Sequence, residues 1–250
     1  MYSRADLIVA AIAVPLAAAV TVGLFFLLRK KSKRVQLIPF IVITVIIIIG
    51  EIVKQAGSIA NDYNLWHIPL HVCSIFLFTF PLAVFLKQGS RASNVFWAAS
   101  LITGTLVSIT LLFAPGVVIG GANHNHVYGE FESSFHHFID LHTVVFHYLL
   151  LIFIVLAYLL RMYKPKLLEI IWSLVVFGVF LLLAAILANV LDVNYSSFLD
   201  VPFLLNAIRD SAAPTFVFQT LLWLFYMVSA VIMGAILLLI EKHVKKRTTS

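Results

Sequence analysis

A row of polar side chains in a long apolar segment is the clearest chemical pattern in the sequence. His136, Asp140, Thr143 and His147 follow one another at intervals of four, three and four residues. On an α-helix their directions fall within about 60° of one another, and Glu132 extends the row if the helix starts early. Ionisable groups at membrane depth cost about 2.5–3.5 kcal/mol on insertion scales, so they usually face a bundle interior or a cavity. The row predicts a polar-lined interior or, alternatively, a structural network at the helix mouth.

The only cysteine, Cys73, marks a second candidate site. It lies in the segment His67-Ile68-Pro69-Leu70-His71-Val72-Cys73-Ser74, in which Pro69 suits a first helical turn. A helix N-terminus favours thiolate over thiol, and a thiolate is a competent acyl nucleophile. His71 points to nearly the opposite side of a regular helix, so His147, expected at similar depth, is the better partner. We therefore predict a Cys73–His147 pair, although most buried cysteines are inert small hydrophobes.

Further polar residues are expected around this pair. His67 and His71, four apart on a helix, share a face and are predicted to orient substrate. Glu51 and Lys54 are predicted to form an intramembrane ion pair. Arg209 is suited to hold a lipid phosphate, although pairing with a nearby aspartate explains it equally well. The remaining supporting candidates, at the end of the sixth predicted helix, are Asn189 and Asp192.

Histidines also raise the question of a metal site. Asn123-His124-Asn125-His126 is followed by His136 and His137, and imidazole suits zinc and its neighbours. The spacing matches no specific zinc signature, so we predict neither a resident metal nor another cofactor.

Composition identifies the elements that must position these residues. The chain has 250 residues, 62% of them hydrophobic and 11% charged, against about 25% charged in a soluble domain. Apolar runs of 18 or more residues recur, and each is long enough to cross a hydrocarbon core roughly 30 Å thick. We predict an all-α, polytopic membrane bundle. The formal charge of +6 does not indicate nucleic-acid binding, because its placement follows membrane topology.

Hydropathy and helix breakers predict about seven transmembrane helices in a single domain. The first apolar run is read as a retained helix because it is longer than a signal-peptide core and is closed by a basic block. A basic cytoplasmic tail is expected at 241–250. The predicted helices are 6–29, 35–56, 68–88, 92–114, 137–161, 167–191 and 214–240.

Charge placement predicts the orientation. Of the 17 lysines and arginines, all but Arg4, Lys54 and Arg209 fall in alternate connections, as the positive-inside rule requires for an external N-terminus and a cytoplasmic C-terminus. Eight of the nine histidines and nine of the eleven carboxylates fall on the other side, with the long connections 115–136 and 192–213. Long loops on one side of a rigid scaffold often carry function. We expect a multi-pass protein of the cell membrane whose site lies near the extracytoplasmic surface.

Three sequence elements resemble one known family. The stretch Trp66–Ser74 resembles the "LPLHLC" element of the YwaF-like integral membrane family, with Ile68 and Val72 in place of two leucines. Phe146-His147 is similar to the family's later "FxxH" helix, and 189–195 is similar to its asparagine–tyrosine motif. The resemblance covers roughly 35–240, and the family is related to an animal ether-phospholipid acyltransferase thought to use a cysteine and a histidine.

The resemblance implies acyl transfer from a phospholipid to a lysophospholipid through a thioester on Cys73. His147 best matches the motif histidine, with His136 and His142 in competition. Two other functions remain open: a proton-coupled transporter or lipid-binding protein using Glu51, Asp140 and His147, and a metal-dependent lipid hydrolase. The sequence indicates no oligomeric state.

Overall fold

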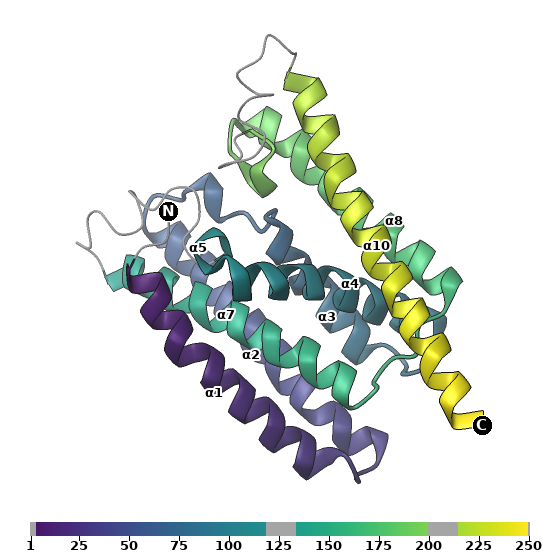
Figure 1. Ribbon diagram of the computed structural model, residues 1–250. Helices are drawn as coiled ribbons and strands as arrows, with labels where there is room; N and C mark the ends of the chain where they lie inside the picture. The colour runs from purple at the N-terminus through teal and green to yellow at the C-terminus, as the bar shows by residue number, and fades with distance from the viewer. Residues whose placement is uncertain (1–3, 119–133, 200–214, 250) are drawn as a thin grey trace.

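Lipid offers no water to backbone amides, so apolar segments that enter it must satisfy their hydrogen bonds as helices. The computed structural model describes residues 4–118, 134–199 and 215–249, and these fold as an all-helical bundle (Figure 1). Within these described ranges, six helices are long and apolar enough to cross a membrane, and Val72–Phe85 forms a shorter apolar helical stretch. The predicted all-α, multi-pass membrane architecture is confirmed.

Short connections join most of the helices that follow one another in the sequence. Among the described residues, the 3-10 turns η1 and η2 lie between α2 and α3, and η3 follows α8. The bounds are α1 Arg4–Leu28, α2 Lys33–Ala60, η1 Leu65–His67, η2 Val72–Ile75, α3 Phe76–Phe85, α4 Arg91–Phe113, α5 Pro115–Val118, α7 Ser134–Leu159, α8 Leu167–Leu191, η3 Tyr195–Ser197 and α10 Thr215–Thr249.

The largest difference from the predicted ranges concerns the third segment. One helix over 68–88 was expected, but the chain forms η1, an irregular connection, η2 and then the ten-residue α3. Pro69 consequently lies between two 3-10 turns and not in the first turn of a helix. At the other end of the chain, α10 continues without a break through the residues expected to form a separate tail.

Two groups of helices pack around α4 and α7. On one side α1 and α2 pack against α7, and on the other α3, α8 and α10 pack against α4 (Figure 1). An aromatic cluster joins the groups: the ring of Phe80 stacks on Phe153 at 3.7 Å, and Trp97 and Phe40 pack on the same Phe153 ring. Gly104 of α4 permits close approach of α7, since a Cβ there would lie 2.4 Å from Ile154 Cδ1. The middle of the bundle is therefore tightly interdigitated.

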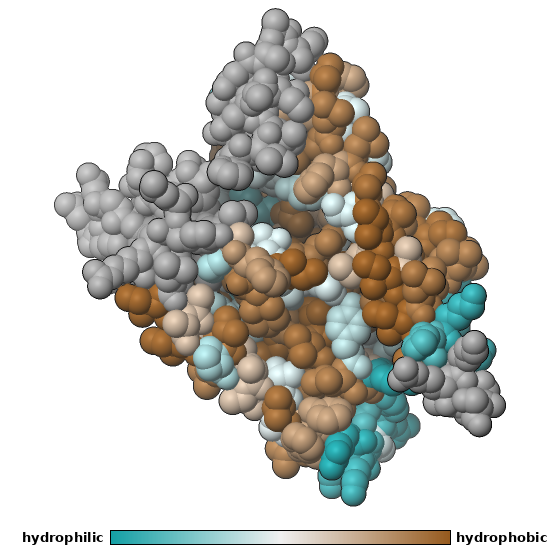
Figure 2. All heavy atoms as spheres, viewed as in Figure 1, coloured by the Kyte–Doolittle hydropathy of each residue, from teal (hydrophilic) through white to brown (hydrophobic). Residues whose placement is uncertain are grey.

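The turns rich in lysine and arginine meet at one end of the molecule, here called the basic end. Lys33 donates to the carbonyl of Leu160 at 2.7 Å, and Arg161 pairs with Glu241 at 2.7 Å, so the α1–α2 turn, the α7–α8 turn and the last turns of α10 are tied together. Figure 2 shows hydrophilic side chains gathered near this end and hydrophobic ones over most of the remaining surface. The other end of the bundle, here called the polar end, carries the candidate site.

Candidate functional site

Glu51, near the polar end of α2, is the charged centre of the site. Its Oε1 accepts hydrogen bonds from Lys54 Nζ at 2.9 Å and from Gln55 Nε2 at 2.7 Å. His142 Nε2 of α7 lies 3.9 Å from Glu51 Oε2. Only 13% of the Glu51 side chain is exposed, so these partners offset the cost of keeping a carboxylate at this depth. The predicted Glu51–Lys54 pair is present.

Gln55 and Ser58 extend this cluster toward the irregular segment after α2. Gln55 Nε2 also donates to the carbonyl of His67 at 2.7 Å, and its Oε1 accepts from the Tyr63 hydroxyl at 2.7 Å. Ser58 Oγ lies 2.7 Å from His67 Nδ1. Burial and then the charge of Glu51 raise the pKa of Tyr63, so its hydroxyl remains a donor at neutral pH. These bonds hold the segment against α2.

His71 lies between two aromatic rings and does not share a helical face with His67. Its Nε2 lies 3.2 Å from the Trp66 carbonyl, and its ring is 4.5 Å from the ring of Trp66 and 5.7 Å from that of Tyr195. The expected common face is absent because the two histidines belong to separate 3-10 turns. Burial lowers the pKa of His71 to about 4, so the ring is neutral at pH 7 and donates through Nε2 to the carbonyl.

The asparagine–tyrosine segment after α8 anchors the same region from the other side. The Tyr195 hydroxyl donates to the Leu65 carbonyl, and Ser196 Oγ donates to the Leu70 carbonyl at 2.7 Å. Tyr226 of α10 in turn donates to the Ser196 carbonyl at 3.2 Å. Burial raises the pKa of Tyr195, which keeps the hydroxyl protonated as a donor. Two elements distant in sequence, η3 and α10, thus fix the backbone that leads to Cys73.

Cys73 lies in η2, one residue after its first, and is partly buried. The thiol interacts with its own backbone amide and with the Ser74 side chain, and it is an electrostatic neighbour of Lys54 and Glu51. Tyr226 of α10 is another electrostatic neighbour. The thiol therefore lies between these polar neighbours and the hydrophobic core, against which Cys73 packs.

On α7 the predicted polar row leads to a histidine with one ring nitrogen in use. His147 Nδ1 lies 2.7 Å from the Thr143 carbonyl, and Thr143 Oγ1 donates to the Ile139 carbonyl at 2.9 Å. Since a carbonyl accepts, Nδ1 carries the proton and Nε2 bears the lone pair of a neutral ring. The side chain is only 3% exposed, and Nε2 has no hydrogen-bond partner among the described residues. Asp140, half-buried on the same helix, also has interactions of its own.

His142 belongs to a different face of α7. It packs against Gly50 of α2, where an added Cβ would lie 3.0 Å from His142 Cδ2, and it approaches Glu51. Two of the three histidines that compete for the role of base are therefore separated: His142 contacts α2, and His147 is enclosed in the core.

The structure leaves other candidates apart from this cluster or outside its description. Asn189 is exposed and exchanges hydrogen bonds with Gln219 of α10 at 3.0 Å, and Asp192 is an exposed left-handed cap of α8 with φ 51°. Neither Arg209 nor the 123–126 histidine motif is in the described residues, and the His136 side chain is outside them too. Where the chain is described, no three His, Cys, Asp or Glu side chains gather closely enough to share a metal ion.

Sequence reasoning missed the polar residues Ser58, Tyr63, Ser196 and Tyr226. One signal was available, because Glu51, Gln55 and Ser58 recur at i, i+4 and i+7, the same spacing rule that marks the α7 row. No comparable signal exists for Ser196 and Tyr226, since both act through backbone carbonyls far away in sequence.

Comparison with known families now places the protein. The family model named TMEM164 family matches residues 1–241, nearly the whole chain. The chain belongs to the TMEM164 family. No curated protein and no solved structure matches it. Membership of this transmembrane family agrees with the six long apolar helices, so the candidate site is that of a membrane-embedded member of the TMEM164 family.

Proposed function

We propose that this TMEM164-family protein is a lipid acyltransferase or acyl hydrolase of the cell membrane. Its substrates are a membrane phospholipid and a lysophospholipid, with Cys73 as nucleophile and His147 as base. The proposal includes the relation to YwaF-like proteins and to the ether-phospholipid acyltransferase, and a site near the extracytoplasmic surface.

The state of the His147 ring is the observation that carries the proposal. A general base needs a lone pair directed away from its own scaffold and a second nitrogen that fixes the tautomer. His147 has this arrangement, because Nδ1–H is bound to the Thr143 carbonyl and Nε2 has no partner among the described residues. An unpartnered, buried ring nitrogen is costly, which makes it a candidate for function. His142 Nε2 also has no hydrogen-bond partner among the described residues, but it lies 3.9 Å from Glu51, whereas His147 is enclosed in the core.

The stacking of Phe80 on Phe153 supports a similar depth for the two groups. Both helices run from the polar end toward the basic end, and counting seven residues back from each stacked ring gives Cys73 on one chain segment and Phe146, the neighbour of His147, on the other. Phe146 shares the helical face of Phe153, and His147 points about 100° away from it. The stack therefore supports a similar depth for Cys73 and His147, and the proposal adds that the two side chains meet during turnover.

Cys73 lies beside a paired ammonium and carboxylate, and its sulfur is removed from water. Lys54 and Glu51 are both electrostatic neighbours of the sulfur, which also interacts with its own amide and with the Ser74 side chain. Removal from water disfavours a thiolate, so the proposed mechanism depends on proton transfer to His147 during attack and not on a thiolate formed beforehand. Lys54 is held in turn by Glu51.

The chemistry follows directly from these roles. His147 Nε2 takes the thiol proton as the sulfur attacks an ester carbonyl of the phospholipid, and helix-terminal amides stabilise the oxyanion. The ester C–O bond then breaks, the leaving lysolipid oxygen takes the proton from His147, and the acyl group remains as a thioester. A lysophospholipid hydroxyl, deprotonated by His147, next attacks the thioester and releases the thiol. Water in place of that hydroxyl gives hydrolysis.

Acyl exchange by the purified protein tests the proposal. Liposomes would contain a phospholipid with an isotopically labelled acyl chain and an unlabelled lysophospholipid, and mass spectrometry would follow the label. Cys73→Ala should abolish both exchange and a hydroxylamine-sensitive acyl adduct on the protein. Full exchange by Cys73→Ala would exclude the thioester route.

A second function is favoured by the contact between Glu51 and His142. A carboxylate and an imidazole 3.9 Å apart inside a membrane helix pair form one step of a proton path in a coupled transporter. Proton uptake by protein-containing liposomes on addition of lysophospholipid, lost in Glu51→Gln and retained in Cys73→Ala, would favour transport over acyl transfer.

A further inference from the structure

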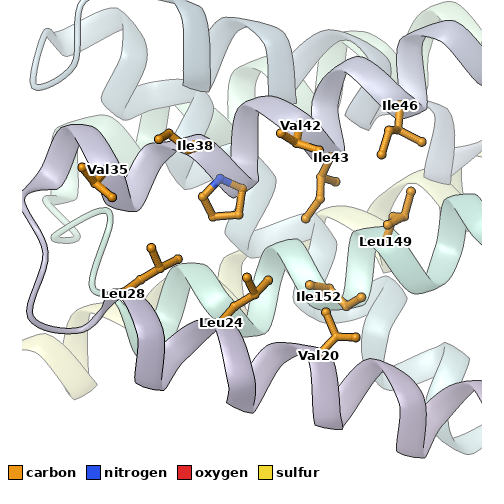
Figure 3. Close-up of a pocket in the computed structure, with 11 residues that line it drawn as sticks. Val20, Leu24, Leu28, Val35, Ile38, Val42, Ile43, Ile46, Leu149 and Ile152 are labelled. Atoms are coloured by element: carbon orange, nitrogen blue, oxygen red, sulfur yellow. The ribbon is translucent and has the colours of Figure 1, made fainter.

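An apolar groove runs along the basic half of the bundle between α1, α2 and α7. Its volume is about 420 Å³, and Figure 3 shows side chains from all three helices directed into it. Leu28 and Val35 line one end, and Ile46 and Leu149 line the other. Every lining residue is apolar, so the groove offers dispersion contacts and no hydrogen bond from a side chain.

The length of the groove matches one leaflet. From Val35 to Ile46, α2 rises about 16 Å at 1.5 Å per residue. Half of a hydrocarbon core roughly 30 Å thick is about 15 Å, the depth that one acyl chain spans. Several lining side chains of α2 are themselves exposed, among them Ile38 at 52% and Val42 at 49%, so the groove opens sideways from the bundle. An extended chain can enter it from the bilayer without crossing protein.

The inner end of the groove closes on the polar cluster. Gly50 lies one helical turn beyond Ile46 on α2, and His142 lies two turns before Leu149 on the same face of α7. The contact of Gly50 with His142 ends the apolar lining there. A chain in the groove would therefore end its path beneath Glu51 and His142.

The outer end of the groove is strongly basic. Leu28 and Val35 flank the α1–α2 turn, whose exposed Arg29, Lys30, Lys31 and Arg34 follow one another within six residues. Arg29 stands over the Phe26 ring at 4.8 Å. Basic residues at a membrane surface attract anionic lipid headgroups. The pairing of an apolar groove with a basic mouth is complementary to a lipid that carries a negative headgroup above an acyl chain.

We propose that the α1–α2–α7 groove binds one acyl chain of an anionic phospholipid, whose headgroup lies on the basic turn Arg29–Arg34. This lipid site is separate from Cys73 and does not depend on the proposed acyl transfer. It assigns a role to α1, whose surface is otherwise largely exposed and which takes no part in the polar cluster.

Native mass spectrometry of the purified full-length protein tests the groove. The protein would be Cys73→Ala, to prevent turnover, and would be exchanged from nanodiscs of equal phosphatidylglycerol and phosphatidylcholine. We expect one retained phosphatidylglycerol. Val42→Trp, which fills the groove, should remove it, whereas Val179→Trp on the exposed face of α8 should not. Equal retention in both tryptophan variants would overturn the site.

Charge variants test the headgroup end of the same site. Replacing Lys30 and Lys31 by glutamine should lower the preference for phosphatidylglycerol over phosphatidylcholine by about fivefold or more. Lys87→Gln with Lys242→Gln removes two exposed lysines from the α3–α4 turn and from α10, which do not line the groove, and should change little. An equal loss in both double variants would assign the preference to general surface charge and refute the basic mouth. Acyl exchange is measured separately, with Cys73 present, so the two proposals can fail independently.

Discussion

The two halves of α2 show how one helix serves opposite environments. In the basic half its groove-facing side chains are Ile43, Ile46 and their apolar neighbours, and the groove is open at the side. In the polar half Glu51 and Gln55 are covered by His142 and by the chain around His67. Polar side chains occur on α2 where another segment of the protein supplies hydrogen-bond partners. Apolar side chains occur where α2 faces the lipid or the open groove.

The two regions also differ in what holds them together. The groove is bounded by regular helices, whose backbone bonds are internal to each segment. The polar region includes irregular chain, and its carbonyls at Leu65, His67 and Leu70 are bound by side chains from α2 and η3. Regular packing therefore shapes the groove, whereas specific hydrogen bonds shape the polar cluster.

The largest difference between the two regions is expected on substituting His142 and His147 of α7. If only the enclosed ring acts as base, His147→Gln should lower acyl exchange by about 10²–10⁴-fold, the usual contribution of a general base. His142→Gln, on the α2 face, should lower it far less. Initial rates of label exchange, with thermal unfolding as a check on folding, measure both. A larger loss of exchange in His142→Gln would mean that His142, beside Glu51, is the base and that His147 is not.

Placing a charge in the groove tests its apolar character. Ile46→Asp sits at the midpoint of α2, and an aspartate at the centre of a membrane helix costs about 2.5–3.5 kcal/mol. Denaturant titration in mixed micelles should show a loss of that order, and Ile46→Leu should be nearly neutral. If Ile46→Asp is tolerated, water already fills the groove and its contrast with the polar cluster disappears.

Gly50 marks the boundary between the regions and should be sensitive to one methyl group. Gly50→Ala places a Cβ 3.0 Å from His142 Cδ2, and overpacking of this kind costs about 1–3 kcal/mol. Gly23→Ala on α1 is the matched control, because its Cβ would meet nothing within 4 Å. The control should be neutral or stabilised by up to about 1 kcal/mol through helix propensity. Thermal unfolding of the two variants gives the comparison, and similar melting temperatures would contradict the contact.

The smallest expected effect concerns the anchor of the irregular segment. Tyr195→Phe removes the donor to the Leu65 carbonyl at a cost of about 1 kcal/mol. It should also speed the reaction of Cys73 with a water-soluble maleimide, because the segment before η2 loosens. Tyr158→Phe removes a comparable hydroxyl bond, to Thr105 on α4, and should leave the thiol unchanged. Equal reactivity in the two variants would mean that Tyr195 does not position the segment.

The sequence predicted the regular parts of the molecule better than the irregular ones. Long apolar runs form helices because lipid leaves the backbone no other way to satisfy its hydrogen bonds. The polar spacing on α7 also predicted a helix on which Thr143 and His147 lie one turn apart, so that the Thr143 carbonyl fixes the His147 tautomer. The prediction of one helix over 68–88 was wrong because the first part of this segment is as apolar as a membrane helix. Its Leu70 carbonyl is instead bound by Ser196, more than a hundred residues away in the sequence. Side-chain bonds over such separations leave no local signal.

The hydrogen bonds of the asparagine–tyrosine segment give its residues different roles from those expected from the sequence. Asn189 and Asp192 were expected to support the site directly, yet Asn189 bonds to Gln219 and Asp192 caps α8. The contribution comes from the next few residues, Tyr195 and Ser196, which hold the chain leading to Cys73. A motif located correctly in sequence can thus act through positions beside the expected ones.

The helical stretch Val72–Phe85 is too short to traverse a bilayer by itself. Its four 3-10 residues and ten α-helical residues together rise about 23 Å, some 7 Å less than a typical hydrocarbon core. A short span draws the adjoining interface toward it, thinning the lipid layer locally. If the proposed acyl transfer holds, such thinning would bring the ester linkages of nearby lipids down to the level of Cys73 while their headgroups stay hydrated. A polar product would then leave without crossing a dry layer.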